Sequence, residues 1–134
     1  MKGKKFPIFL ALTVLFLSAL ACDFSASTAK ISDAWMSADE DGAERVTAFA
    51  QDAVFYAQVD LQNAPDDTTL KAVWTAVEAQ DTEPNFMINE TEFVTGSGQV
   101  HFTLSNDNLW PTGKYKVDIY MNDQLANTVE FEVR

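Results

Sequence analysis

The sequence predicts an all-β fold, an antiparallel β-sandwich of about seven strands that follows an N-terminal signal segment. Short stretches in which apolar and polar residues alternate recur through residues 30–134, and turn-forming residues separate them about every 8–12 residues. Helical periodicity is nearly absent, since residues 39–49 could hold one helical turn and Gly42 weakens even that. An up-and-down barrel is the alternative architecture for the same elements.

Four strands are expected in the first part of the domain. Residues 31–37 and 46–50 are assigned as early strands. Residues 54–61 alternate cleanly, with Phe55, Ala57, Val59 and Leu61 on one face and Tyr56, Gln58 and Asp60 on the other. After a turn at residues 63–67, residues 69–77 form the next strand, because they are rich in β-branched residues and include Trp74.

Four shorter or later strands complete the domain. Residues 92–95 predict a short strand that ends at Gly96-Ser97-Gly98, and residues 99–105 predict one with Val100, Phe102 and Leu104 inward. After a turn at residues 110–113, residues 114–121 place Tyr115, Val117, Ile119 and Met121 on one face. A turn at Asn122-Asp123 then leads into residues 125–133, with Val129, Phe131 and Val133 inward, so this pair is expected to be a hairpin.

Residues 1–21 have the features of a secretory signal rather than of a folded segment. Three lysines at positions 2, 4 and 5 precede an apolar run at residues 6–17, and small residues follow it. The apolar run is shorter than the roughly 20 residues that a membrane-spanning helix needs. A permanent transmembrane helix is therefore the weaker interpretation.

The end of this segment, Ser18-Ala19-Leu20-Ala21-Cys22, resembles the lipobox of bacterial lipoproteins, in which cleavage precedes a lipid-modified Cys. Ala19 stands where the lipobox prefers Leu, and ordinary cleavage after Ala21 is the alternative. The resemblance implies a signal peptide at residues 1–21, lipidated Cys22 in a tether at residues 22–29, and a folded domain at residues 30–134. It also implies attachment to the extracytoplasmic face of the cell membrane through the lipid, since two or more acyl chains make anchoring stable.

A second resemblance lies near the C-terminus. Residues 109–117, LWPTGKYKV, resemble the penultimate strand of immunoglobulin-like domains in secreted bacterial proteins, where a proline-glycine turn precedes Gly-x-Tyr-x-Val. Residues 128–133, TVEFEV, resemble the closing strand of those domains. The resemblance implies an immunoglobulin-like β-sandwich for residues 30–134, without the pair of cysteines found in antibody domains.

Composition excludes several classes of function. Without residues 1–21 the chain keeps 20 acidic and six basic residues, a net charge of −14, which repels nucleic acid phosphates and argues against a nucleic acid partner. One Cys and one His exclude a disulfide framework, a Cys-based zinc site and a multi-histidine centre. Acidic residues 39–41 and 66–67 are interpreted as solvated loops, because they lack the ligand spacing of an EF-hand. We therefore expect neither a metal nor a cofactor.

Candidate site residues are few, and none predicts catalysis. His101 lies on the solvent face of its predicted strand, and the sequence signals no nucleophile or orienting partner for it. Tyr56 and Tyr120 also fall on the phase opposite to the core, so Tyr56, Tyr120 and His101 form the candidate binding face.

The sequence thus favours a non-catalytic, lipid-anchored extracytoplasmic β-sandwich that serves as a protein-binding or structural module. The alternative is an accessory subunit that presents a carbohydrate or a cation to a transporter or enzyme.

Overall fold

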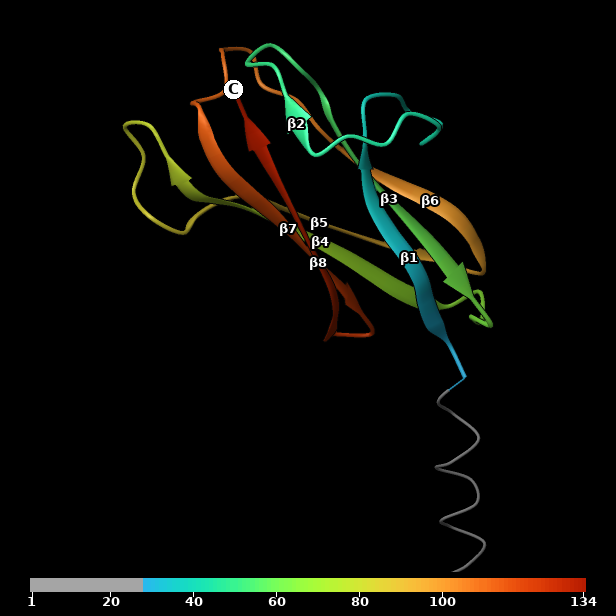
Figure 1. Cartoon of the computed structure of the whole chain (residues 1–134). Helices are drawn as coiled ribbons and strands as arrows, with labels where there is room; N and C mark the ends of the chain where they lie inside the picture. The colour runs from blue at the N-terminus through green and yellow to red at the C-terminus, as the bar shows by residue number, and fades with distance from the viewer. Residues whose placement is uncertain (1–27) are drawn as a thin grey trace, which may run out of the picture.

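The structure is a computed structural model that describes residues 28–134. These residues form eight strands in two sheets (Figure 1). The strands are β1 (Lys30–Ser37), β2 (Ala48–Phe49), β3 (Phe55–Gln62), β4 (Thr68–Ala79), β5 (Phe86–Thr95), β6 (Gly98–Leu104), β7 (Gly113–Met121) and β8 (Gln124–Val133). No helix in this part of the chain is long and apolar enough to cross a membrane. The predicted signal peptide, Cys22 and most of the tether lie outside the described residues.

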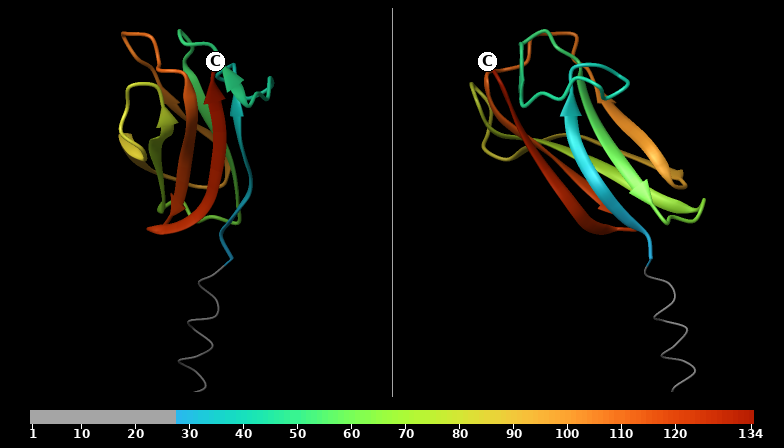
Figure 2. Two further views of the ribbon diagram at one scale, coloured as in Figure 1. Left: turned by 60° about the vertical axis from the view of Figure 1, so that its left-hand side comes forward. Right: turned by 45° about the vertical axis from the view of Figure 1, so that its right-hand side comes forward.

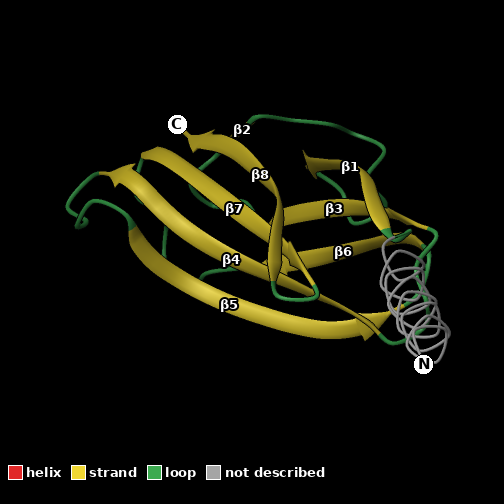
Figure 3. Cartoon of the chain, turned by 90° about the horizontal axis from the view of Figure 1, so that it is seen from below, coloured by secondary structure: helices red, strands yellow, loops and turns green. Residues whose placement is uncertain are grey.

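The two sheets confirm the predicted sandwich. One sheet has the order β1-β3-β6 and the other the order β2-β8-β7-β4-β5. All pairs are antiparallel except β2 with β8, which is parallel. Figure 3 shows β8, β7, β4 and β5 side by side in one layer and β3 and β6 in the other. Because both sheets have free edges, the up-and-down barrel is not the architecture.

Aromatic side chains fill the core between the sheets, as the alternation of the strands predicts. The ring of Phe55 on β3 lies at its centre, 4.5 Å from Trp110 and 4.9 Å from Phe131 between ring centroids. Trp74 on β4 is 1% exposed and stacks against Phe55. Burial of these large rings supplies much of the apolar area that drives folding.

The turn before β7 explains the Gly-x-Tyr pattern. The hydroxyl of Tyr115 donates a 2.6 Å hydrogen bond to the carbonyl of Pro111, four residues upstream. This is the tyrosine corner found in immunoglobulin-like sandwiches. At Gly113, where φ is 150°, a Cβ atom would lie 2.2 Å from the carbonyl oxygen of Glu78, so only glycine lets β7 approach β4 there.

Three strand predictions differ from the structure by more than one residue in their limits. The fifth strand begins at Phe86 rather than at residue 92, and β4 extends over 12 residues. The early strand predicted at residues 46–50 is reduced to the two residues of β2. In the pairing of β4 with β5, Trp74 opposes Asn89 and Thr75 opposes Met87, so Ile88 is an extra residue in β5. This bulge interrupts the alternation that would have marked the strand in the sequence.

Candidate functional site

The three residues of the predicted binding face do not form one surface. Tyr56 on β3 and His101 on β6 share the outer face of the three-stranded sheet, with ring centroids 6.2 Å apart. Tyr120 lies on β7 in the other sheet, where the ammonium group of Lys71 is 4.7 Å from its ring centroid. The two sheets turn their outer faces away from each other, so Tyr120 is on the opposite side of the sandwich from the other two residues.

His101 points away from the core, as its phase predicts, but the loop that follows β1 approaches it. Its Nε2 atom lies 3.6 Å from Oε1 of Glu40, and its side chain is half-buried. Its cross-strand partner on β3 is Gln58. His101 therefore lies at the border of a polar network rather than on an open platform.

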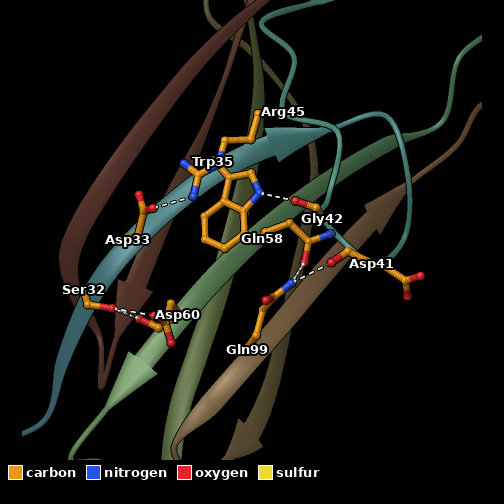
Figure 4. A network of polar contacts seen from close by, with 9 residues as sticks. All are labelled: Ser32, Asp33, Trp35, Asp41, Gly42, Arg45, Gln58, Asp60 and Gln99. Atoms are coloured by element: carbon orange, nitrogen blue, oxygen red, sulfur yellow. Dashed lines mark hydrogen bonds and ion pairs between the residues drawn. The ribbon is translucent and has the colours of Figure 1, made fainter.

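Gln58 is the centre of that network, and its phase alone would place it in solvent. It is fully buried because the loop of residues 38–45 folds over the outer face of the sheet. Its Nε2 donates to Ser37 Oγ at 3.1 Å and to the Glu40 carbonyl at 2.9 Å. Its Oε1 accepts from Gln99 Nε2 at 3.2 Å, and Gln99 also donates to the carbonyl of Asp41 (Figure 4). The centre of this face is thus closed by the chain itself.

One acidic side chain of the same loop, that of Asp39, has a structural role. The carboxylate of Asp39 accepts hydrogen bonds from the backbone N–H groups of Glu44, at 2.9 Å, and Ala43, at 3.1 Å. The Glu44 N–H is the largest influence and lowers the pKa of Asp39; desolvation comes second and opposes it, and the Ala43 N–H lowers the pKa further. Within residues 28–134, no three His, Cys, Asp or Glu side chains gather closely enough to hold a metal ion.

Beside this loop, Trp35 on β1 is held in place by two contacts. Its Nε1 donates to the Gly42 carbonyl at 3.0 Å, and the guanidinium of Arg45 lies 4.1 Å from its ring centroid. Arg45 is also paired with Asp33 at 2.8 Å. Because Arg45 covers a face of the indole, this Trp is not an open stacking platform (Figure 4).

An open surface is the free edge of the five-stranded sheet that β5 forms. β5 forms this edge over ten residues, and it carries three exposed apolar side chains: Phe86 (50% exposed), Met87 (56%) and Val94 (62%). A long edge with exposed apolar side chains is unusual for a protein that binds nothing there, since such edges template the pairing of further strands. The prediction of a strand only at residues 92–95 missed this feature, although the run Phe86-Met87-Ile88 was a signal for it.

A cavity of about 370 Å³ adjoins the start of β5 and opens between the two sheets. Phe86 and Ile88 of β5, Leu104 and Ser105 at the end of β6, and Trp110 and Tyr115 of the tyrosine corner line it. We call the border between β5 and β6, where the two sheets meet, the seam. At the other end of β5 the seam is closed, because Phe93 packs against Phe102 with ring centroids 4.8 Å apart. The cavity thus lies at the end of β5 that is remote from this contact.

The architecture is similar to that of solved structures. An immunoglobulin-like protein from Pseudomonas aeruginosa is similar with a TM-score of 0.53 and 15% sequence identity, over 81% of this chain and 98% of that one. The chain has an immunoglobulin-like fold. The implied fold of residues 30–134 is therefore confirmed.

Two further similarities are weaker. An alkylpurine DNA glycosylase from Pseudomonas fluorescens, bound to DNA containing an abasic site analog, gives a TM-score of 0.48 at 14% identity, and 79% of this chain covers 30% of it. A beta-glucosidase from Listeria innocua gives 0.49 at 15% identity, and 79% of this chain covers 16% of it. The chain spans less than a third of either protein, and neither likeness carries an argument about function. No protein-family model and no curated protein matches the sequence.

Proposed function

We propose that the chain is a non-catalytic, lipid-anchored module that binds a protein on the extracytoplasmic side of the cell membrane. The observation that carries the proposal is the free edge of β5 with its three exposed apolar side chains. An edge strand offers unpaired backbone N–H and C=O groups, and an extended polypeptide can satisfy both kinds at once. The immunoglobulin-like fold supports the proposal, since it provides a rigid frame for such an edge.

The anchoring half of the proposal rests on the lipobox-like residues 18–22. Cys22 precedes β1 by eight residues, a length that spans at most about 29 Å when fully extended. The start of β1 pairs with the end of β3, and the end of β6 lies at the other end of the sandwich (Figure 2). Leu104 at the end of β6 lines the cavity. A lipid on Cys22 would therefore leave the cavity and the start of β5 directed away from the bilayer.

Replacement of the lipidated residue tests the anchor. We expect Cys22→Ser to release the protein from the membrane fraction or to leave it as an unprocessed precursor, because the thioether to the lipid cannot form. Cell fractionation and mass spectrometry of the mature N-terminal peptide measure this. Wild-type and variant chains that fractionate alike, with no lipid mass on that peptide, would contradict the anchor.

Photo-cross-linking in intact cells tests the binding function. We expect a photoreactive amino acid at position 87 on β5 to give a discrete cross-linked protein, because Met87 lies on the proposed surface. Leu125 on β8 provides the matched control, since it is exposed to the same extent, 56%, on a different strand. Adducts from neither position, together with a rise in melting temperature on addition of a sugar or Ca²⁺, would instead favour the accessory ligand-binding subunit.

A further inference from the structure

We propose that the β5 edge and the adjoining cavity bind an extended polypeptide segment in which apolar and basic side chains alternate. This inference rests on the proposed protein-binding function and specifies its site and the chemistry of its partner. Three features of the structure carry it: the two faces of β5, the apolar cavity beside Phe86, and the charge of the surrounding segments.

The two faces of β5 present different chemistry to a strand added at its edge. Phe86 pairs with Ala76, a core residue of β4, so it belongs to the inner face of the sheet. Met87, Glu90 and Glu92 pair with Thr75, Val73 and Lys71 on the outer face. Side chains of an added strand alternate between the same two faces. One set would therefore enter the space between the sheets beside Phe86, and the other would lie beside Met87, the two glutamates and Val94.

The inner set is expected to be apolar. The cavity of about 370 Å³ has the rings of Phe86, Trp110 and Tyr115 and the side chains of Ile88 and Leu104 in its wall. Its volume lies within the range of roughly 300–1,000 Å³ that is usual for sites that enclose a ligand. Phe86 remains half-exposed although it belongs to the inner face, and it lines the open cavity. A large apolar side chain from an added strand would cover this ring.

The outer set is expected to be basic at the positions that lie beside Glu90 and Glu92. Residues 76–95 and 104–111, which flank the seam, contain six acidic residues and no Lys or Arg. Lys71 of β4 lies 3.5 Å from Glu90, and within residues 28–134 no ion pair involves Glu92. Opposite charges on facing positions of neighbouring strands stabilise the pair, and like charges destabilise it. A Lys or Arg beside Glu90 and Glu92 would be favoured.

The same charges disfavour a second copy of this chain as the occupant. In a symmetric pairing of two β5 edges, the same strand lies on both sides of the interface. When the two strands pair over their full length, Glu90 and Glu92 of one copy lie close to the same acidic residues of the other, with no basic residue on either β5 to offset them. A chain of different composition is therefore the occupant that the edge accepts.

Binding of synthetic peptides to the full-length protein in detergent micelles tests the inference. The probe is an acetylated ten-residue peptide that alternates Lys with Val and carries one central Phe, labelled for fluorescence anisotropy. We expect saturable binding that weakens about tenfold or more when the Phe is replaced by Ala, because the cavity then stays empty. A peptide with Glu in place of Lys should not bind. Alternate N-methylation of the probe backbone, which removes its N–H donors, should also abolish binding.

Matched protein variants locate the site. The double variant Glu90→Gln and Glu92→Gln should weaken binding of the Lys peptide about threefold to tenfold. Asp66→Asn with Asp67→Asn removes the same charge at the β3–β4 turn, and it should change binding by less than about twofold. Ser105→Trp, which fills the cavity mouth, should abolish binding, and a melting curve for each variant establishes that it is folded.

Three outcomes would overturn the inference: no binding of the Lys peptide, equal binding of the Glu peptide, or equal losses in the two double variants. Cross-links from position 87 in cells would in that case leave the proposed protein-binding function standing with a different partner chemistry. Failure of both experiments would remove the function as well as the inference.

Discussion

At the scale of single residues, the hydroxyl of Tyr115 gives a sharp test of the tyrosine corner. Tyr115→Phe removes only the oxygen that donates to the Pro111 carbonyl. We expect the free energy of unfolding to fall by about 1 kcal/mol, the usual net worth of one intramolecular hydrogen bond. Urea denaturation at pH 7 measures the change. Tyr120→Phe is the control, since Tyr120 lies on an outer face and its variant should keep almost the full free energy of unfolding. Equal decreases in the two variants would contradict a special role for the corner.

Residues whose burial follows from strand phase could be predicted from the sequence. Phe55, Trp74 and Phe131 share their phase with aliphatic neighbours, and all three are in the core. Gln58 could not be predicted, because its phase points outward and its burial depends on a loop that folds over the sheet. The alternation of inward and outward residues correctly placed Tyr56 and Tyr120 on outer faces. It could not show that the two residues lie on different sheets, because that depends on the strand order.

At the scale of elements, the loop of residues 38–45 should lose stability at acidic pH. The folded pKa of Asp39 lies below its ordinary value of 3.8, chiefly because the Glu44 N–H binds the carboxylate. A group with a lowered folded pKa stabilises the fold above its unfolded pKa, and this stabilisation is lost as the pH falls through the folded pKa. We therefore expect the melting temperature of Asp39→Asn to decline less than that of wild type below pH 3.8.

The matched control for this loop is Asp67→Asn, which changes an exposed aspartate in the β3–β4 turn. It should follow the wild-type pH dependence more closely than Asp39→Asn does. Amide hydrogen exchange at Ala43 and Glu44 gives a second measurement, because both N–H groups donate to the Asp39 carboxylate. Exchange that is unchanged in Asp39→Asn, after correction for intrinsic rates, would show that these hydrogen bonds do not hold the loop.

The strands themselves show where sequence patterns are informative and where they are not. The β7–β8 hairpin was predicted within two residues, because its apolar and polar residues alternate and Asn122-Asp123 marks the turn. The first half of β5 was missed, because the extra residue Ile88 breaks the alternation and both faces of an edge strand are partly exposed. The part of the chain that carries the candidate site is thus the part whose pattern is least regular.

At the scale of the whole molecule, the prediction of an all-β sandwich needed only the rhythm of strands and turns. The cavity could not be predicted, because strands of both sheets line it and their relative placement depends on the tertiary packing. The strongly acidic composition is also a property of the whole chain. It bears on stability, because like charges repel one another in the compact state.

This repulsion leads to a prediction about salt. At a net charge of −14 for residues 22–134, we expect the melting temperature to rise with ionic strength, because salt screens the repulsion. NaCl and CaCl₂ at equal ionic strength should raise it equally, since the Asp39 carboxylate is engaged by backbone N–H groups. A calcium site would instead give a larger gain from millimolar CaCl₂ by mass action. The double variants Asp66→Asn with Asp67→Asn and Asp39→Asn with Asp41→Asn would then show which cluster binds calcium, because only one of them would lose the extra rise in melting temperature. That outcome would contradict the interpretation of both clusters as solvated loops.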